Sequence, residues 1–486
     1  MRLPASLGDL SPADLARIAA NHGSPYTEDY ANVFEPLRPH VVQASLDELA
    51  DDALAPVQVR CSELGVAPAQ LSLRVLAVAL YGRGTADPGG PTVFDILEAL
   101  ERTNTMSYED FQRISAHVLK HDAPEGKVTV VWLDGQGCVG YKNLKKRFSR
   151  TYARFLIGVG GFHEHAHSLF AFTETLWEPF FGFGIKFLKI ERVLRVTQNL
   201  EHNAYGHHQN GHHVTTLASL AYLIQDVRDP PPELLLRRGL AVYMLHVQRA
   251  GGRAMCAYLH GGGLPALQWQ RAGRNAEGGK FKLLLAYSFH LYRSTCHKPV
   301  AAQIVLIALL GFECALPALQ TVLLATMSLS LFGRLSACVY SDRLLEFINN
   351  LQQGSQRSAS SASFGHALDL TTLLRSMLHV RHAFQAEETG TTEGDDPITE
   401  SMLVQARLLQ NEYRRILGDD LTVPDGDNPF HHTGLSVPLD AGDYRFRRPW
   451  EWVWRTAEGR SAGKGRRVER WDVYVRRFLY EHFFPF

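Results

Sequence analysis

The chain has 486 residues, of which 45% are hydrophobic, enough for a large core and for two or three domains. Its 50 basic and 50 acidic residues give no net charge, so overall charge does not indicate a polyanion-binding protein. Locally, however, residues 142–154 and 445–477 are basic and residues 387–396 are acidic. The six cysteines are far apart, with no C-x-x-C pair, which excludes a small disulfide scaffold and favours a reducing compartment, nuclear or cytoplasmic.

Residues 1–122 predict a helical N-terminal domain. Ser11 is a typical N-cap, and Gly23 is a typical helix stop. The segment 1–23 lacks the apolar stretch of a signal peptide. Helical spacing continues through residues 47–82, and a loop rich in glycine and proline is expected at 82–91.

Two β-strands are predicted near the middle of the chain. Residues 127–133 form a short valine-rich apolar run, typical of a buried strand. Residues 153–161 have the same character and end in Gly158, Gly160 and Gly161. Because glycine has no Cβ, these three positions predict close approach of other groups to the backbone.

Residues 165–350 are expected to be mostly helical. Residues 169–188 and 301–333 are long and apolar, and the second stretch contains only one charged residue, Glu313. Its length would allow a membrane-spanning helix. Pro317 and the lack of flanking aromatic residues favour a pair of buried core helices instead, and both interpretations remain open.

Composition suggests the remaining boundaries. Residues 230–252 predict one helix opened by prolines and closed by glycines, and residues 354–365 form a serine-rich linker. Between residues 445 and 477 there are eleven Lys or Arg and four acids, interleaved with Trp and Tyr. That mixture suits a phosphate backbone with stacked bases, or else a helix that docks by its aromatic residues and leaves its arginines in water.

Asp134 is the first candidate site residue. It follows the first predicted strand, where a carboxylate can bind Mg²⁺ together with substrate phosphates. A run of cations without acids follows, at Lys142, Lys145, Lys146, Arg147, Arg150 and Arg154. Alternatively, Asp134 with Gly135 is only a turn dipeptide.

Histidines form the second candidate group. On a strand, His163, His165 and His167 would share one face, whereas on a helix only His163 and His167 would. Residues 202–213 contain five more histidines, and Gly211 favours a loop, which could be merely polar and solvated. The spacing is also similar to that of membrane-bound di-iron desaturases and hydroxylases, although the third histidine box and the four membrane spans of that family are not found. This alternative implies iron bound by His163, His167, His208, His212 and His213.

Asp342 and Glu346 form the third candidate group. They are four residues apart, so on a helix they share one face. Asp342 could also serve as a helix cap or an ordinary surface acid.

The sequences at 133–136 (LDGQ), 141–148 (YKNLKKRF) and 157–170 (IGVGGFHEHAHSLF) resemble, in this order, a eukaryotic family of transposon-derived proteins, known mainly as a domain of unknown function. The resemblance covers roughly residues 125–350. It implies a ribonuclease-H-like core in which one strand ends in Asp-Gly-Gln, a second ends in Pro-Gly-Asp-aromatic-His, and a late helix carries an acid.

The resemblance also implies the roles of individual residues. Asp134 matches the first acid, His163 the histidine, and Glu346 or Asp342 the late acid. The implied chemistry is phosphoryl transfer by paired Mg²⁺ ions. Gly161 stands where the family has its middle acid, which should weaken metal binding and catalysis, and Glu164 could replace that acid only if the strand end shifted. The zinc-binding cysteine clusters of the family are also missing.

The sequence therefore predicts an α/β, predominantly helical fold that consists of a helical N-terminal domain and a ribonuclease-H-like core with a large helical insertion. The expected domains are 1–122, the core 123–352, a linker and helical segment 353–440, and a basic aromatic segment 441–486. The expected partner is DNA, bound by Lys142, Lys145, Lys146, Arg147, Arg150, Arg466 and Arg467. Mg²⁺ would be bound by Asp134, His163 and Glu346, with Asp134, Glu346 and Asp342 as catalytic acids of a site that is either active or degenerate. A helical scaffold without enzymatic activity is a further alternative.

Overall fold

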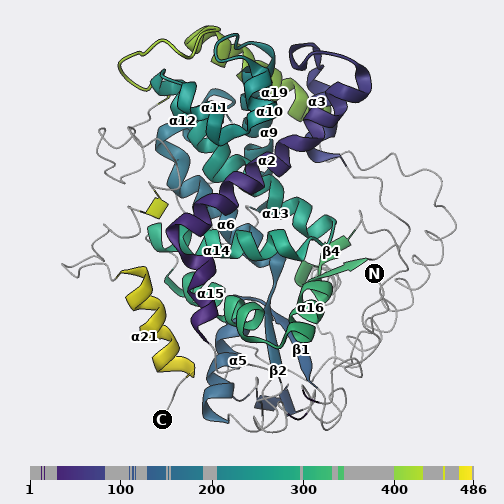
Figure 1. Ribbon diagram of the computed structural model, residues 1–486, viewed down its shortest axis with the longest axis vertical. Helices are drawn as coiled ribbons and strands as arrows, with labels where there is room; N and C mark the ends of the chain where they lie inside the picture. Colours follow the sequence, from purple (N-terminus) through teal and green to yellow (C-terminus); the bar gives the residue numbers. More distant parts are fainter. Residues whose placement is uncertain are drawn as a thin grey trace, which may run out of the picture.

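The computed structural model describes residues 30–82, 128–148, 155–189, 205–295, 299–330, 338–343, 399–430, 453–454 and 470–483, and a few single residues between them. This part of the chain is predominantly helical, as predicted (Figure 1). Its α-helices are α2 Pro39–Leu64, α3 Leu73–Tyr81, α5 Gly135–Arg147, α6 Gly161–Leu176, α7 Gly182–Phe187, α9 Tyr205–Gln225, α10 Pro232–Arg238, α11 Leu240–His246, α12 Ala250–Tyr258, α13 Leu264–Arg274, α14 Gly278–Ser294, α15 Pro299–Cys314, α16 Pro317–Thr326, α19 Glu400–Leu417 and α21 Trp471–Phe483.

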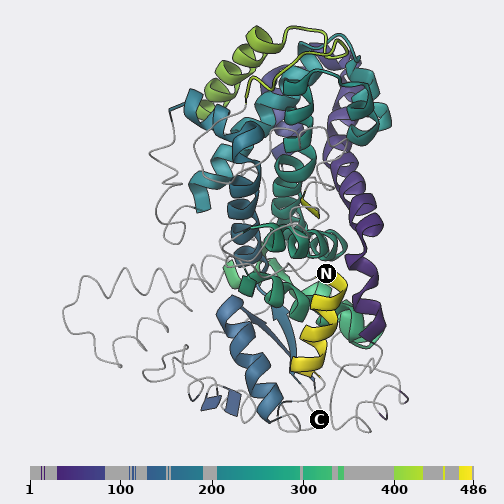
Figure 2. The same ribbon diagram turned by 90° about the vertical axis from the view of Figure 1, so that its left-hand side faces the viewer.

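Short helical turns connect several of these helices. Three are 3₁₀ turns, at Tyr30–Val33, Glu35–Leu37 and Pro68–Gln70. Two are π turns, Trp177–Phe181 between α6 and α7 and Leu259–Gly263 between α12 and α13. The molecule is elongated. The two strands at Thr129–Leu133 and Phe155–Val159 lie with α5 at one end, and α10, α11 and α19 lie at the other (Figures 1 and 2).

The two predicted strands form a parallel pair. Strand β1 (Thr129–Leu133) pairs with β2 (Phe155–Val159) in a register that places Thr129 opposite Phe155 and Leu133 opposite Val159. Helix α5 lies in the connection between them, as a parallel connection requires a crossover. The described residues contain one other sheet, in which β3 (Ser328–Ser330) and β4 (Cys338–Tyr340) are antiparallel.

Close packing explains the glycines of β2, as predicted. A Cβ on Gly158 would lie 2.5 Å from the ring of Trp132, the residue of β1 that pairs with Gly158. Helix α15 packs against β2 on another side, and a Cβ on Gly311 would lie 3.1 Å from the carbonyl oxygen of Ile157. All five residues of β2 are buried, whereas those of β1 are half-buried.

The apolar segment 301–333 belongs to the core within its described residues. Helices α15 and α16 contact each other and α14, and the side chains of α15 contribute to the larger of two hydrophobic clusters. The second apolar stretch, 169–188, is divided among α6, a π turn and α7. Among the described residues, no helix combines the length and the hydropathy that crossing a membrane requires.

Helix α2 links the two ends of the molecule (Figure 1). It begins directly after Arg38 and ends at Gly65, whose φ of 63° is left-handed and suits glycine. Residues Val42 to Leu49 pack into one hydrophobic cluster and Ala50 to Cys61 into the other. The described residues of the expected N-terminal domain therefore share their core with the central segment.

Two helix predictions need correction. Residues 230–252 do not form one helix, because Gly239 adopts a φ of 83° between α10 and α11 and a Cβ there would lie 2.2 Å from the carboxylate of Asp51. The histidine segment from Tyr205 onward is not a loop but the beginning of α9, in which Gly211 is buried. Dense packing overrides the low helix propensity of glycine there.

Several predicted features lie outside the described residues. They are the helix at 11–23, the loop at 82–91, the serine-rich linker, the acidic segment 387–396, and the residues His202, Arg150, Arg154, Glu346, Arg466 and Arg467. Described cysteines 61, 138, 256, 314 and 338 are all free and buried.

Candidate functional site

Asp134 lies at the carboxyl end of β1 and is exposed. It is the N-cap of α5, and its Oδ1 accepts a hydrogen bond of 2.6 Å from the backbone N–H of Gly137. This interaction satisfies one of the free amides at the start of the helix and uses one of the two carboxylate oxygens.

Asp342 lies just after β4 and is 5% exposed. Its Oδ1 accepts a hydrogen bond of 3.0 Å from the backbone N–H of Phe162, and its Oδ2 accepts one of 3.0 Å from that of His163. Asp342 therefore caps α6, although it comes about 180 residues later in the chain. The residue at the N-cap position of α6 is Gly160, which has no side chain that could accept a hydrogen bond from the first amides of the helix.

His163 completes this arrangement. Its Nδ1 lies 2.9 Å from Asp342 Oδ2, and its side chain is 31% exposed, compared with 4% for that of Asp342. When Nδ1–H donates to the carboxylate, the imidazole is held in the tautomer with its lone pair on Nε2. A carboxylate in this position orients a histidine for proton transfer or for binding a cation.

Gly160 connects Asp134 with Asp342. Its backbone N–H donates a hydrogen bond of 2.7 Å to the carbonyl oxygen of Leu133, the residue before Asp134. On its other side, a Cβ on Gly160 would lie 2.3 Å from Asp342 Oδ2. The parallel pairing of β1 and β2 thus places Gly160 beside the exposed Asp134, and the buried Asp342, which follows β4, lies against the other side of the same glycine.

An aromatic ring lies against Gly161, where the family resemblance would place an acid. A Cβ on Gly161 would lie 2.3 Å from the ring of Tyr340, which is buried and donates a hydrogen bond of 2.5 Å to the carbonyl oxygen of Trp269. Glu164 does not take the place of the acid. It is 1% exposed and accepts a hydrogen bond of 2.9 Å from the hydroxyl of Tyr292, on the inner side of α6.

The described residues do not fit a pair of Mg²⁺ ions. Two-metal sites need several carboxylates around ions roughly 4 Å apart. Both oxygens of Asp342 already accept hydrogen bonds, Gly161 carries no acid, and no group of three or more His, Cys, Asp or Glu in the described part of the chain could hold a metal ion. Asp134 and His163 remain at the edge, and Glu346 lies outside the described residues.

The cap formed by Asp342 has a measurable consequence. In Asp342→Asn, one carboxylate oxygen becomes an NH₂ group that faces backbone N–H donors, and the charge is lost. We expect the free energy of unfolding to fall by about 2 kcal/mol, as for a buried, charge-assisted hydrogen bond. Urea denaturation measures this loss.

Asp425→Asn is the matched control, because Asp425 is exposed and accepts a single hydrogen bond of 2.7 Å from the first amide of α12. We expect its loss to be less than half that of Asp342→Asn. Equal losses would show that burial of Asp342 adds nothing to the cap.

The basic residues do not all point to solvent. Lys142, expected to contact phosphate, is 6% exposed, and its Nζ lies 5.5 Å from the ring centre of Phe478 on α21. Arg147 at the end of α5 is exposed. Lys145 and Lys146 lie on the same helix, but the positions of their side chains are outside the described part of the structure.

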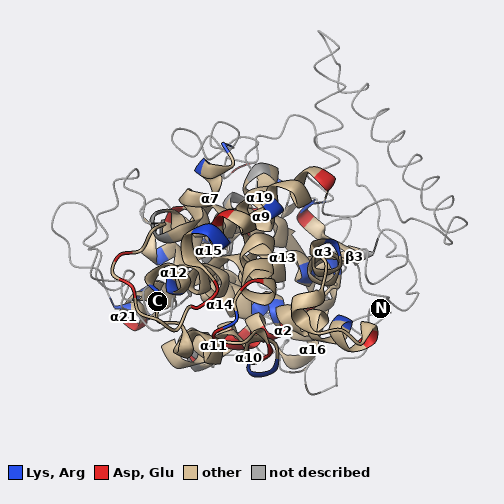
Figure 3. Ribbon diagram, turned by 90° about the horizontal axis from the view of Figure 1, so that it is seen from above, with Lys and Arg blue, Asp and Glu red and all other residues tan. Residues whose placement is uncertain are grey.

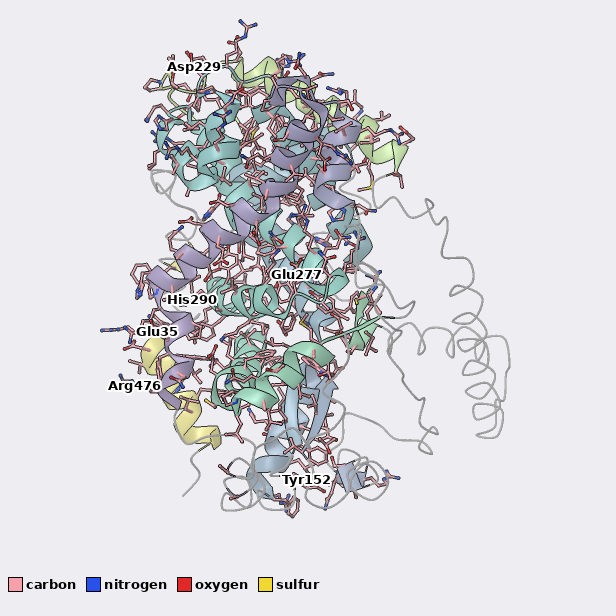
Figure 4. All side chains as sticks on the ribbon, turned by 45° about the vertical axis from the view of Figure 1, so that its right-hand side comes forward. Glu35, Tyr152, Asp229, Glu277, His290 and Arg476 are labelled. Atoms are coloured by element: carbon pink, nitrogen blue, oxygen red, sulfur yellow. The ribbon has the colours of Figure 1, made fainter. Side chains whose placement is uncertain are left out.

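Helix α21 docks by its apolar face, as one of the two interpretations predicted. Val475, Phe478 and Leu479 are buried, whereas Arg476 and Arg477 are exposed. The Arg476 guanidinium lies 5.8 Å from the ring centre of Phe34, at the edge of the molecule near Glu35 (Figure 4). Because α21 contacts α5, Arg147, Arg476 and Arg477 lie on neighbouring helices, which we call the α5–α21 basic face.

Four of the remaining candidate histidines, His165, His208, His212 and His213, are buried in the core and do not belong to a solvated loop. Helix α6 carries His163, His165 and His167, so the helical alternative is correct, and it packs against α9. His208 and His212 on α9 both lie within 3.1 Å of the Thr173 hydroxyl on α6. His213 is buried beside the Tyr81 ring. The histidines of the proposed iron site thus form no metal-binding group among the described residues.

Burial makes these histidines difficult to protonate. It lowers the pKa of His213 to about 3, helped by the nearby charge of Arg274. It also lowers the pKa values of His165 and His212 well below that of free histidine, and neighbouring histidines add to the effect in both cases. His165, His212 and His213 are therefore neutral at pH 7.

Comparisons of the chain with protein-family models, with curated proteins and with solved structures find no match. The site is thus defined by its own geometry. Sequence reasoning found Asp134, Asp342 and His163 but missed Tyr340 and Arg343, because neither belongs to a motif or follows a recognisable period.

Proposed function

We propose that this chain is a transposon-derived nucleic-acid-binding protein whose phosphoryl-transfer site, of the kind found in DDE transposases with a ribonuclease-H-like core, is degenerate. The observation that carries the proposal is the convergence of Asp134 and Asp342, about 200 residues apart, around Gly160 at the carboxyl edge of β1 and β2. Open α/β sheets bind ligands at this edge. The motif order LDGQ, YKNLKKRF and GGFHEH is consistent with that ancestry.

The degenerate state follows from the side chains. Asp342 stabilises α6 and orients His163, and the Tyr340 ring occupies the space that an acid at position 161 would need. Asp134 alone offers an exposed carboxylate. One carboxylate can help to place a hydrated Mg²⁺ against a phosphate, but a single weak ligand does not hold two ions.

Nucleic-acid binding is supported by the α5–α21 basic face. Arg147, Arg476 and Arg477 are exposed on these helices, and α21 lies beside the end of the molecule that carries β1 and β2 (Figure 2). Cations arranged along two adjacent helices suit a phosphate backbone, which sets most of the affinity in such complexes.

Fluorescence anisotropy with labelled DNA, at a series of salt concentrations, tests the proposal. We expect affinity to fall steeply with salt, and the triple variant Arg147→Ala, Arg476→Ala, Arg477→Ala to reduce the log–log slope by about 3, roughly one per phosphate contact. We also expect no Mg²⁺-dependent cleavage. Absence of binding at low salt would overturn the proposal, and cleavage that Asp134→Asn abolishes would overturn its degenerate part.

A further inference from the structure

Arg343 is held beside the candidate site by its neighbour. Asp342 is fixed to the first amides of α6, so the backbone of Arg343 is fixed there too. The Arg343 side chain is exposed, and its guanidinium carbon lies 5.7 Å from the ring centre of Phe162, the second residue of α6. A cation over an aromatic face at this distance is a favourable interaction of about 0.5–1 kcal/mol at an exposed position.

Other rings hold Phe162 in place. The Tyr205 ring lies edge-on to it at 4.9 Å between centres, and the His163 ring lies edge-on at 5.4 Å. Tyr205 is fixed in turn, because its hydroxyl lies 3.1 Å from His165 Nδ1. Phe162, His163 and Tyr205 are all half-buried residues, and the side chain of His163 is 31% exposed. We call these three residues with Arg343 the Phe162 platform.

We propose that the Phe162 platform binds one nucleotide of a single-stranded nucleic acid, with Arg343 on the phosphate and an unpaired base stacked on the aromatic rings. The inference rests on the proposed function and names the form of nucleic acid that the site takes. The planar guanidinium of Arg343, near the Phe162 ring, carries several N–H donors that can match a phosphate in two hydrogen bonds. Stacking requires an unpaired base, so a duplex does not satisfy the platform.

The position of the platform fits this role. Phe162 and His163 directly follow Gly160 and Gly161, and Gly160 is bonded to the residue before Asp134. A strand bound here would run past the exposed carboxylate of Asp134. The buried charge of Asp342 does not repel a phosphate strongly, because two backbone amides and His163 surround it.

The test is anisotropy with a fluorescein-labelled oligothymidylate and with a duplex of the same length. Arg343→Ala is expected to weaken binding of the single strand about tenfold, because the contribution of one stacked base and its phosphate is of this size. Arg343→Lys, which keeps the charge but loses the planar guanidinium with its paired N–H donors, is expected to weaken single-strand binding about threefold. Phe162→Leu is expected to weaken single-strand binding about tenfold and duplex binding less than twofold.

Arg228→Ala is the control for charge. The Arg228 side chain is 85% exposed and adjoins Asp229 at the opposite end of the molecule (Figure 4), where Lys and Arg alternate with Asp and Glu (Figure 3). The affinity of Arg228→Ala for the labelled DNA is expected to stay within twofold of that of the wild-type chain. Equal effects of Arg343→Ala and Arg228→Ala, with wild-type binding intact, would overturn the platform alone. Failure of the wild-type chain to bind either DNA would overturn the proposed function as well.

Discussion

Acidification from pH 6.5 to pH 4.5 is expected to lower the free energy of unfolding by about 5 kcal/mol from two buried histidines alone, at about 1.4 kcal/mol per pH unit for each. Burial lowers the pKa of both His213 and His290 to about 3. Their unfolded pKa is near 6.5, so the unfolded state binds more protons below that pH. Their contribution to stability is complete above pH 6.5 and is lost as the pH falls towards 3.

Further histidines steepen the same dependence. The pKa values of His165 and His212 are lowered in the same direction and, again, chiefly by burial. Because typical domains have a total stability of only about 5–15 kcal/mol, we expect the protein to unfold between pH 6 and pH 4. Urea denaturation followed by circular dichroism at intervals across this range measures the slope.

The slope of the unfolding free energy against pH identifies which histidine causes the loss of stability. In His213→Gln, the dependence of the unfolding free energy on pH should decrease by about 1.4 kcal/mol per unit between pH 6 and pH 4.5, whatever the variant costs at pH 7. His246→Gln, which replaces an exposed histidine, should leave the slope as in wild type. An unchanged slope in His213→Gln would mean that this histidine is already protonated in the folded protein.

The second large effect is expected from Gly161→Asp, which introduces an acid where the transposon-derived family that the motifs resemble would have one. The new Cβ would lie 2.3 Å from the buried Tyr340 ring. Moving that ring breaks its hydrogen bond to the Trp269 carbonyl. Overpacking costs about 1–3 kcal/mol, and an unpaired buried charge adds to that, so we expect a loss of about 4 kcal/mol or more.

Two more variants separate the causes. Gly161→Ala introduces the clash without the charge and should lose about 2 kcal/mol. Gly279→Ala on α14 is the control, since a Cβ there meets nothing within 4 Å and alanine favours a helix by a few tenths to about 1 kcal/mol. Thermal and urea unfolding measure the stability of all three variants, Gly161→Asp, Gly161→Ala and Gly279→Ala. Wild-type stability in Gly161→Asp would mean that an acid fits beside Tyr340 and that the site is less altered than we propose.

Local patterns in the sequence predicted the elements of the site. Valine-rich runs predicted β1 and β2, and the glycines at the end of β2 indicated close packing, which Trp132, Asp342 and Tyr340 supply. The prediction of Asp134 at the end of a strand was possible because it directly follows the valine-rich run, whereas a late acid near it, Glu346 or Asp342, was only implied by the family resemblance. The beginning of α9 was missed, because Gly211 and a row of polar histidines are locally typical of a loop.

The sequence by itself determined the helical character of the chain, the two strands β1 and β2, and Asp134 at the end of the first strand, because these depend on patterns among near neighbours. Only the tertiary structure decided what those residues do. Asp342 became a buried cap for α6, Lys142 was covered by Phe478, and the histidines of α9 entered the core, because each role depends on a partner that the chain brings from far away. Burial then sets the charge of each group, since the free energy of a charge depends on its surroundings.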